Sequence, residues 1–253
     1  MALAIRLGHA YRSDPGVSTD KELEVVVNIL NGKASLEARK PNEPTVVSRA
    51  EKILGISKPV IYAFVGCLHH DLGRIGLVIS PDCLEGRLQG VTRCDSGGLA
   101  GRVGSFIHIA DADVPGALIA LSIIGGKPDW YALFDDELTR SYPSPAEYIL
   151  GTVPDYGSWT DARVPCLTNP VPSGRALDRR LWTWEVRLTM PPEHKHYEAL
   201  VLSHEASKQL EALRLGGTDV PTEVRILEGN VGEEGVAYFS SKAVFQILAG
   251  DGS

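Results

Sequence analysis

The sequence predicts a protein of the α+β class. Short runs rich in β-branched and aromatic residues, such as residues 60–66 and 74–80, have the composition of strands and are bounded by turn-forming residues. Other segments, such as residues 19–31, carry apolar side chains at helical spacing. Because helices and strands do not alternate regularly, we expect a mixed or antiparallel sheet with flanking helices rather than a parallel βαβ sheet.

The first 57 residues are interpreted as a helical N-terminal segment, followed by an α+β core domain over residues 58–253. Thr19 is a plausible N-cap for the helix over residues 19–31, and Thr45 for a second helix over residues 45–56. The polar stretch between them contains two prolines and has the composition of a linker.

The rest of the chain supplies further strands and helices. Strands are expected over residues 104–111, 181–190, 197–203 and 221–229, and helices over residues 114–126, 131–140, 144–151 and 204–217. Residues 151–178 contain four prolines without a clear periodic pattern. A stretch of this length is uncommon in a compact domain unless it has a use, so we interpret it as a functional loop or lid.

Composition narrows the class of protein. Hydrophobic residues make up 43% and charged residues 23% of the 253 residues, which is typical of a globular domain. The net charge of −7 gives no general attraction to nucleic acid, although a local basic groove is compatible with it.

No apolar run approaches the ~20 residues of a membrane-spanning helix, and no leader segment is apparent. Four cysteines without regular spacing favour reduced thiols and a cytoplasmic location.

Three of the four cysteines lie close together in the sequence, with two histidines. Cys67, His69 or His70, Cys83 and Cys94 are residue types that bind zinc, but they lack the usual pair of cysteines two to four residues apart. We therefore expect no metal and expect the cysteines to be buried as small apolar side chains. A thiol hydrolase remains an alternative, with Cys67 or Cys166 as nucleophile and His69, His108 or His196 as base.

The sequence Asp95-Ser96-Gly97-Gly98 resembles the nucleophile motif of chymotrypsin-like serine proteases. Only 25 residues separate His70 from Ser96, which leaves no room for the two β-barrels of that fold. We predict a turn instead, in which Asp95 and Ser96 cap backbone amides and the glycines adopt positive φ. The glycine-rich residues 97–104 also lack the Lys-Ser/Thr ending of a phosphate-binding loop.

Residues 178–227 carry the most informative pattern. Glu185 lies on a strand between two tryptophans, a Pro-Pro turn follows, and a second strand leads into a helix. Alternation places Trp184 and Val186 on one face of the strand and Glu185 with Arg187 on the other. An exposed polar face with an ion pair is one interpretation. The other is that Glu185 lies at the mouth of a cleft covered by residues 151–178.

This arrangement resembles the C-terminal half of toxin-type ADP-ribosyltransferases, in which a strand glutamate orients the nicotinamide ribose of NAD and an early core strand supplies an Arg or His for NAD. The resemblance implies that Glu185 is catalytic and that NAD is the substrate. It further implies that NAD is held by basic or hydrogen-bonding groups and by aromatic rings, with these candidates: His69, His70, Arg74, Tyr62, Tyr148 and Trp184. The acceptor would be a protein side chain or a nucleobase, as in a toxin or defence effector.

A non-enzymatic partner-binding protein, such as an immunity or adaptor protein, is the alternative from a different class. Its signature would be an exposed apolar patch around Tyr156 and Trp159 in the proline-rich stretch.

Overall fold

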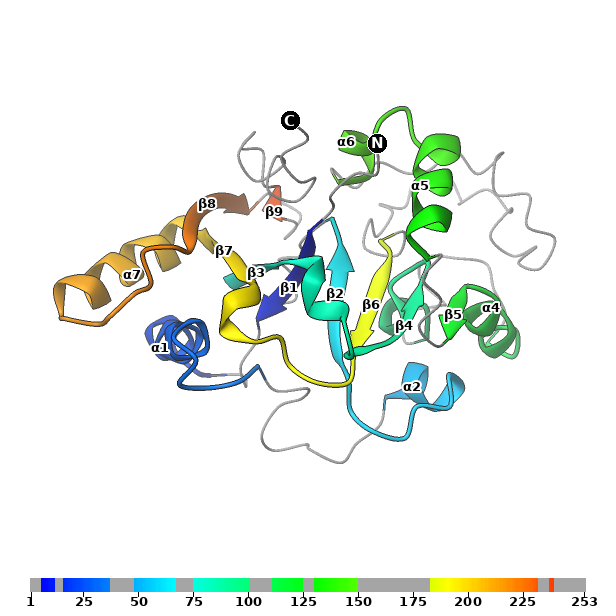
Figure 1. Ribbon diagram of the computed structural model, residues 1–253, viewed down its shortest axis with the longest axis horizontal. Helices are drawn as coiled ribbons and strands as arrows, with labels where there is room; N and C mark the ends of the chain where they lie inside the picture. Colours follow the sequence, from blue (N-terminus) through cyan, green and yellow to red (C-terminus); the bar gives the residue numbers. More distant parts are fainter. Residues whose placement is uncertain are drawn as a thin grey trace.

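The computed structural model describes residues 6–11, 16–36, 48–66, 75–100, 111–124, 130–149, 183–231 and 237–238. Within these ranges the chain forms a mixed sheet flanked by helices, and the α+β class is confirmed (Figure 1). None of the helices in these ranges has the length and apolar character needed to cross a membrane. Residues 67–74, 101–110 and 151–182 lie outside the described ranges.

The sheet contains nine strands in the order β5-β4-β6-β2-β1-β3-β7-β8-β9. The strands are β1 Leu7–Tyr11, β2 Ile61–Val65, β3 Ile75–Ile79, β4 Leu88–Thr92, β5 Ser122–Ile124, β6 Glu185–Leu188, β7 Tyr197–Ser203, β8 Arg225–Val231 and β9 Ala237–Tyr238. The pairings are antiparallel except that of β7 with β8, which is parallel and is joined through helix α7. The expected mixed sheet is therefore present.

Helices cover both faces of this sheet. They are α1 Thr19–Leu30, α2 Arg49–Ile53, α4 Val114–Ala120, α5 Trp130–Ser141, α6 Pro145–Ile149 and α7 His204–Leu215, with 3-10 turns η2 Pro81–Leu84 and η6 His194–His196. Figure 1 shows α1 and α7 beside β3 and β7, and α4 at the opposite end of the sheet beside β5. The expected helix over residues 114–126 is shorter, because after Ala120 the chain turns into β5.

The expectation of an all-helical N-terminal segment is corrected by β1. This strand lies in the middle of the sheet between β2 and β3, so the first 57 residues build part of the core. Helix α1 forms as expected, with Ser18 rather than Thr19 as its N-cap. Helix α2 begins at Arg49 and not near Thr45, because Ser48 and Glu51 form a reciprocal capping box.

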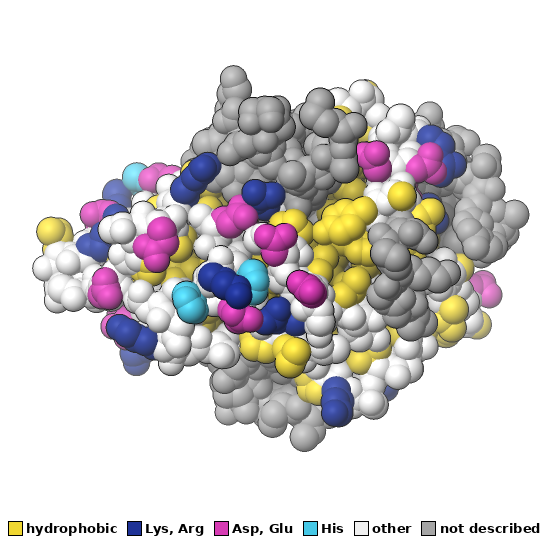
Figure 2. Space-filling model, in the orientation of Figure 1, with side chains coloured by type: hydrophobic (Ala, Val, Ile, Leu, Met, Phe, Trp, Pro, Cys, Tyr) yellow, Lys and Arg dark blue, Asp and Glu magenta, His cyan; other side chains and the backbone are white. Residues whose placement is uncertain are grey.

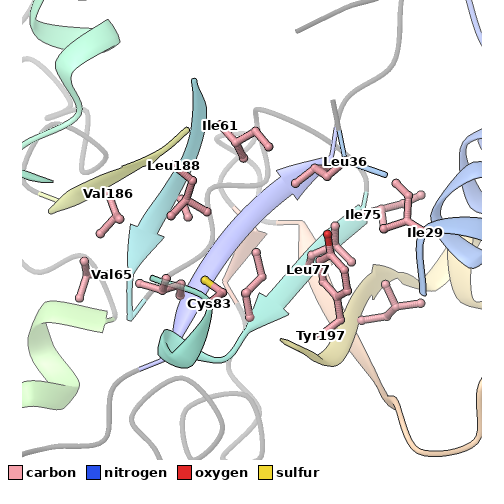
Figure 3. Packing of buried hydrophobic residues seen from close by; sticks show 14 of the residues in the cluster. Ile29, Leu36, Ile61, Val65, Ile75, Leu77, Cys83, Val186, Leu188 and Tyr197 are labelled. Atoms are coloured by element: carbon pink, nitrogen blue, oxygen red, sulfur yellow. The ribbon is translucent and has the colours of Figure 1, made fainter. Parts of the chain in front are cut away.

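Two apolar clusters cover the two faces of the sheet. The larger contains Ile61, Val65, Val186 and Leu188 from β2 and β6, and it also holds Cys83 (Figure 3). The smaller contains side chains of α2 and α4 together with those of residues 94–100, and Tyr62 packs against it. Strand β6 is therefore covered on both faces, and all four of its residues are buried. The interpretation of Glu185 and Arg187 as an exposed polar face is wrong.

Strands β1 and β2 separate from one another along their length. They pair only at Leu7 with Val65 and at Gly8 with Phe64, whereas β1 pairs with β3 over all five of its residues. Beyond Gly8, the His9 side chain approaches the Tyr62 carbonyl, with 2.6 Å between Nδ1 and the oxygen. The separation leaves an opening in the sheet between β1 and β2, close to Glu185 on β6.

Charged side chains of both signs are interspersed on the face of the molecule seen in Figure 2, over β3, β7 and the η2 and η6 turns. Arg87 pairs there with Glu193, and Lys195 pairs with the same carboxylate. The mixture of signs on this face makes it a poor match for the phosphate backbone of nucleic acid, which a single-sign basic surface attracts.

Candidate functional site

Glu185 is the central residue of the site. It is the first residue of β6, between β2 and β4, and only 2% of it is exposed. The Ser96 hydroxyl donates a hydrogen bond of 2.5 Å to Glu185 Oε1, and Arg187 Nη1 lies 3.3 Å from the same oxygen. The carboxyl group is thus held in place from both sides within the protein interior.

The Asp95-Ser96-Gly97-Gly98 sequence begins a short helix next to Glu185. The Gly98 amide donates to Asp95 Oδ1 at 2.8 Å, and residues 96–100 are helical. The predicted capping by Asp95 is therefore confirmed, but neither glycine has positive φ. Gly97 instead lines the pocket described below, where its small size leaves space.

Arg187 is completely buried behind Glu185. Its Nε donates to Gln89 Oε1 at 2.9 Å, and its Nη1 donates to the Thr92 hydroxyl as well as facing Glu185. A buried guanidinium requires such partners, because an isolated charge in the protein interior is costly. Arg187 is consequently part of the site. It is not a member of an exposed ion pair, which was one interpretation of the alternation pattern.

Gly90 on β4 makes room for Arg187. A Cβ at this position would lie 2.9 Å from Arg187 Nη2 and 3.0 Å from the Ile123 carbonyl oxygen. We expect Gly90→Ala to destabilise the protein by about 1–3 kcal/mol, the range found for overpacked interiors, in urea unfolding. Gly116 in α4 is the matched control, since a Cβ added there would have no neighbour within 4 Å and Gly116→Ala is expected to be neutral or slightly stabilising. Equal stabilities of the two variants would contradict this packing.

A pocket of about 210 Å³ opens at the separation of β1 and β2. His9 and Ala10 of β1 line it on one side, and Tyr62 and Phe64 of β2 on the other. Glu185 completes the wall from β6. Ser48, Asp95 and Gly97 supply the remaining lining.

His9 is held as a neutral imidazole. Its Nδ1 contacts the Tyr62 carbonyl oxygen, which selects the tautomer with the proton on Nδ1 and leaves the lone pair on Nε2. Burial lowers the pKa of His9 below its ordinary value, and the carbonyl contact only partly opposes this. His9 therefore offers the pocket a hydrogen-bond acceptor without a charge.

Tyr62 likewise remains neutral. Burial raises the pKa of its phenol well above the ordinary value, and the negative charge of Glu185 raises it further. The Ser48 side chain forms a hydrogen bond that opposes the shift. The ring of Tyr62 is thus an uncharged aromatic wall of the pocket at ordinary pH, while its hydroxyl forms hydrogen bonds with Ser48 and Glu51.

The acidity of Glu185 is strongly perturbed. Burial raises its pKa to about 8, and the negative charge of Asp95 contributes to the increase. Arg187 and the hydrogen bonds from Ser96 act in the opposite direction. A titratable group with such a shift, lining a concave pocket, is typical of a functional site.

Tyr148 and Trp184, the other two aromatic candidates, lie in the larger apolar cluster and do not line the pocket. The Tyr148 hydroxyl donates to the Val65 carbonyl at 2.9 Å and accepts from the Trp184 amide at 3.0 Å. The Trp184 indole donates to Glu137 at 3.1 Å. Both rings stabilise the far face of the sheet, so neither is retained as a ligand-stacking residue.

The remaining candidates fall into two groups. His69, His70 and Arg74, together with Cys67, lie outside the described residues. Cys83 and Cys94 are buried in different apolar clusters, and burial raises the pKa of Cys83 to about 12. Their burial as small apolar side chains is confirmed, and neither thiol has the low pKa of a nucleophile.

Within the described part of the chain, no group of three or more His, Cys, Asp or Glu side chains is arranged to hold a metal ion. The zinc candidates Cys67, His69 and His70 are outside that part. The absence of zinc therefore stays a prediction.

Sequence reasoning assigned no ligand-binding role to His9 and Asp95, which line the pocket, or to Ser96, which donates a hydrogen bond to Glu185. His9 lies in a five-residue strand whose Gly8 and Ala10 have low strand propensity, so the residue pattern gave no signal. Asp95 and Ser96 were recognisable as a cap, but their proximity to Glu185 depends on the distant strand β6. No protein-family model, curated protein or solved structure matches the chain.

Proposed function

We propose that the protein is an ADP-ribosyltransferase-like enzyme that cleaves NAD and transfers ADP-ribose to a macromolecule. The observation that carries the proposal is the meeting of His9, Tyr62 and Glu185, from three neighbouring strands, in one pocket. The family resemblance calls for a strand glutamate and for a His or Arg from an early core strand. We assign the first role to Glu185 on β6 and the second to His9 on β1, in place of His69, His70 and Arg74, which lie outside the described residues.

The size of the pocket bears on how NAD would bind. About 210 Å³ is below the ~300–1,000 Å³ of sites that enclose a drug-sized ligand. It is suited to one aromatic ring with part of a sugar and not to a dinucleotide. Under the proposal, the nicotinamide end enters between Tyr62 and Glu185, and the adenosine end extends out of the pocket.

The chemistry assigned to the site follows from charge. Cleavage of the N-glycosidic bond develops positive charge on the ribose ring in the transition state. The carboxylate of Glu185, fixed by Ser96 and Arg187 in a dry environment, would stabilise that charge without having to reorganise. Tyr62 would contact the nicotinamide face, and His9 Nε2 would accept a hydrogen bond from a ribose hydroxyl.

The raised pKa of Glu185 predicts a pH dependence. The carboxylate is the active form, and its fraction increases as pH rises toward the pKa of about 8. We expect kcat/KM for NAD cleavage to increase about tenfold per pH unit below that value and to level off above it. Burial lowers the pKa of His9 below its ordinary value, so His9 is uncharged where Glu185 titrates. Initial rates from about pH 6 to about pH 10 test this, and a profile that falls with increasing pH would contradict it.

The direct test of the proposal is to incubate the purified protein with NAD and measure the nicotinamide released. Release in proportion to enzyme concentration supports the proposal, and absence of both release and NAD binding in calorimetry refutes it. NAD labelled in the adenylate would then identify the acceptor, with protein, RNA and DNA offered separately. A protein side chain and a nucleobase are both compatible with the pocket, and a cytoplasmic toxin or defence effector is the setting we propose.

The two alternatives retain no supporting observation among the described residues. Tyr156 and Trp159, the expected centre of a partner-binding patch, lie outside them, as do Cys67 and Cys166 of the hydrolase hypothesis. His196, a candidate base, has its Nδ1 occupied by the Glu193 amide at 3.1 Å. We therefore advance the transferase as the single proposal.

A further inference from the structure

We propose that Asp95 makes the pocket selective for a planar organic cation over a neutral ring of the same shape. The inference deepens the proposed function and rests on it for the identity of the ligand, the positively charged pyridinium ring of NAD. Asp95 would thereby be a specificity-determining residue that distinguishes ligands by the charge of their ring when they bind, before any bond is cleaved.

The charge of the lining residues favours a cation. Asp95 and Glu185 are the carboxyl groups that line the pocket, and no Lys or Arg among the described residues does so. Arg187 is buried behind Glu185 and bonded to Gln89 and Thr92. The charge that the described lining offers is therefore negative, which attracts a cation and repels an anion.

The aromatic walls favour a cation as well. Tyr62 and Phe64 from β2 both line the pocket, and their ring faces carry the negative end of the aromatic quadrupole. Cationic ligands bind preferentially against such faces when they are withdrawn from water. A flat cation thus gains from the rings and from the carboxylate together, while its neutral counterpart gains only from burial.

Asp95 is a stronger candidate for this role than Glu185. It is 5% exposed, and its side chain is fixed as the cap of residues 96–100 by the 2.8 Å bond from the Gly98 amide. Glu185 holds its proton at neutral pH because burial and the charge of Asp95 raise its pKa. The charge of Asp95 is itself one cause of that increase, so Asp95 is the lining carboxyl group to which we assign the negative charge.

The test compares two ligands that differ in charge and not in shape. The 1-methylnicotinamide cation and neutral 3-methylbenzamide carry the same substituents on the same ring positions, with ring nitrogen replaced by carbon. In calorimetry at about pH 6, we expect the wild-type protein to bind the cation at least about tenfold more tightly. Asp95→Asn should reduce that preference to about twofold, because the cap is kept and the charge is removed, while burial keeps Glu185 protonated at this pH.

The matched control is Asp82→Asn, which removes the same charge from an exposed position in η2 and should leave the preference unchanged. Equal binding of the two ligands by the wild-type protein would overturn the inference, even if Asp95→Asn failed to fold. An unchanged preference in a folded Asp95→Asn protein would overturn it as well.

The outcomes also separate this inference from the proposed function. A preference for the cation without nicotinamide release from NAD would refute the transferase and retain the cation-selective pocket. Nicotinamide release with equal binding of the two rings would support the transferase and refute the role of Asp95.

Discussion

Glu185→Gln is expected to lower the rate of NAD cleavage by ~100-fold or more, the loss typical of removing one preorganised electrostatic group. Glutamine keeps the size of the side chain and can still accept the hydrogen bond from Ser96. What it lacks is the negative charge that opposes the positive charge developing on the ribose. Nicotinamide release measured above pH 8 gives the fullest comparison, because wild-type Glu185 is ionised there.

Measuring the stability of Glu185→Gln distinguishes a loss of activity caused by the missing charge from one caused by unfolding. The folded pKa of Glu185, about 8, is raised above the ordinary value of 4.5, so the folded wild type retains a proton that the unfolded chain releases. Wild-type stability therefore decreases as pH rises from about 4.5 to about 8, and glutamine removes that dependence. Relative to wild type, Glu185→Gln should become increasingly stable over this range.

The control for this variant is Glu205→Gln, in the exposed first turn of α7, which should change neither activity nor the pH dependence of stability. Thermal unfolding at about pH 5 and about pH 9 measures the effect. A Glu185→Gln protein that is less stable than wild type at the higher pH would show that Glu185 is an ordinary ionised partner of Arg187.

Arg187→Met is expected to destabilise the protein by about 2–6 kcal/mol, because two buried groups lose their hydrogen-bond donor at about 1–3 kcal/mol each. Arg187 is fully buried, and its loss leaves Gln89 and Thr92 without their donor. It also withdraws the cation that lowers the pKa of Glu185, so the pH midpoint of any remaining activity should move upward. Urea unfolding at neutral pH measures the destabilisation.

Arg140→Met is the matched control. Arg140 pairs with Asp136 on the exposed side of α5, with 59% of its side chain exposed. Surface pairs of this kind contribute ~0–1 kcal/mol. If the two arginine variants lost equal stability, the buried network around Glu185 would not have the role assigned to it.

Local sequence predicted the elements whose residues have strong intrinsic preferences. Strands β2, β3 and β7 were found because they are runs of β-branched, aromatic and aliphatic residues, and α7 because of its spacing and terminal glycines. Strand β1 was missed. Its Gly8 and Ala10 are poor strand formers, and pairing with β2 and β3 is what keeps it extended.

The site was predictable only in part, for a related reason. Alternation along β6 correctly separated Glu185 and Arg187 from Trp184, but alternation does not tell which faces are covered. Helices α2 and α4 and residues 94–100 cover the face of β6 that carries Glu185 and Arg187, so this pair is buried and not exposed. Tyr62 was proposed as a ring beside Glu185, and it lines the same pocket. The position of His9 in the pocket depends on the separation of β1 and β2, which the sequence does not predict.

The most direct test of a pocket formed by His9, Tyr62 and Glu185 for NAD is a crystal structure of the Glu185→Gln protein soaked with NAD. Loss of turnover should preserve the intact dinucleotide in the crystal. We expect the nicotinamide ring against Tyr62, with its ribose beside position 185 and within hydrogen-bonding distance of His9. A structure with NAD bound elsewhere, or with this pocket empty at saturating NAD, would contradict the proposal.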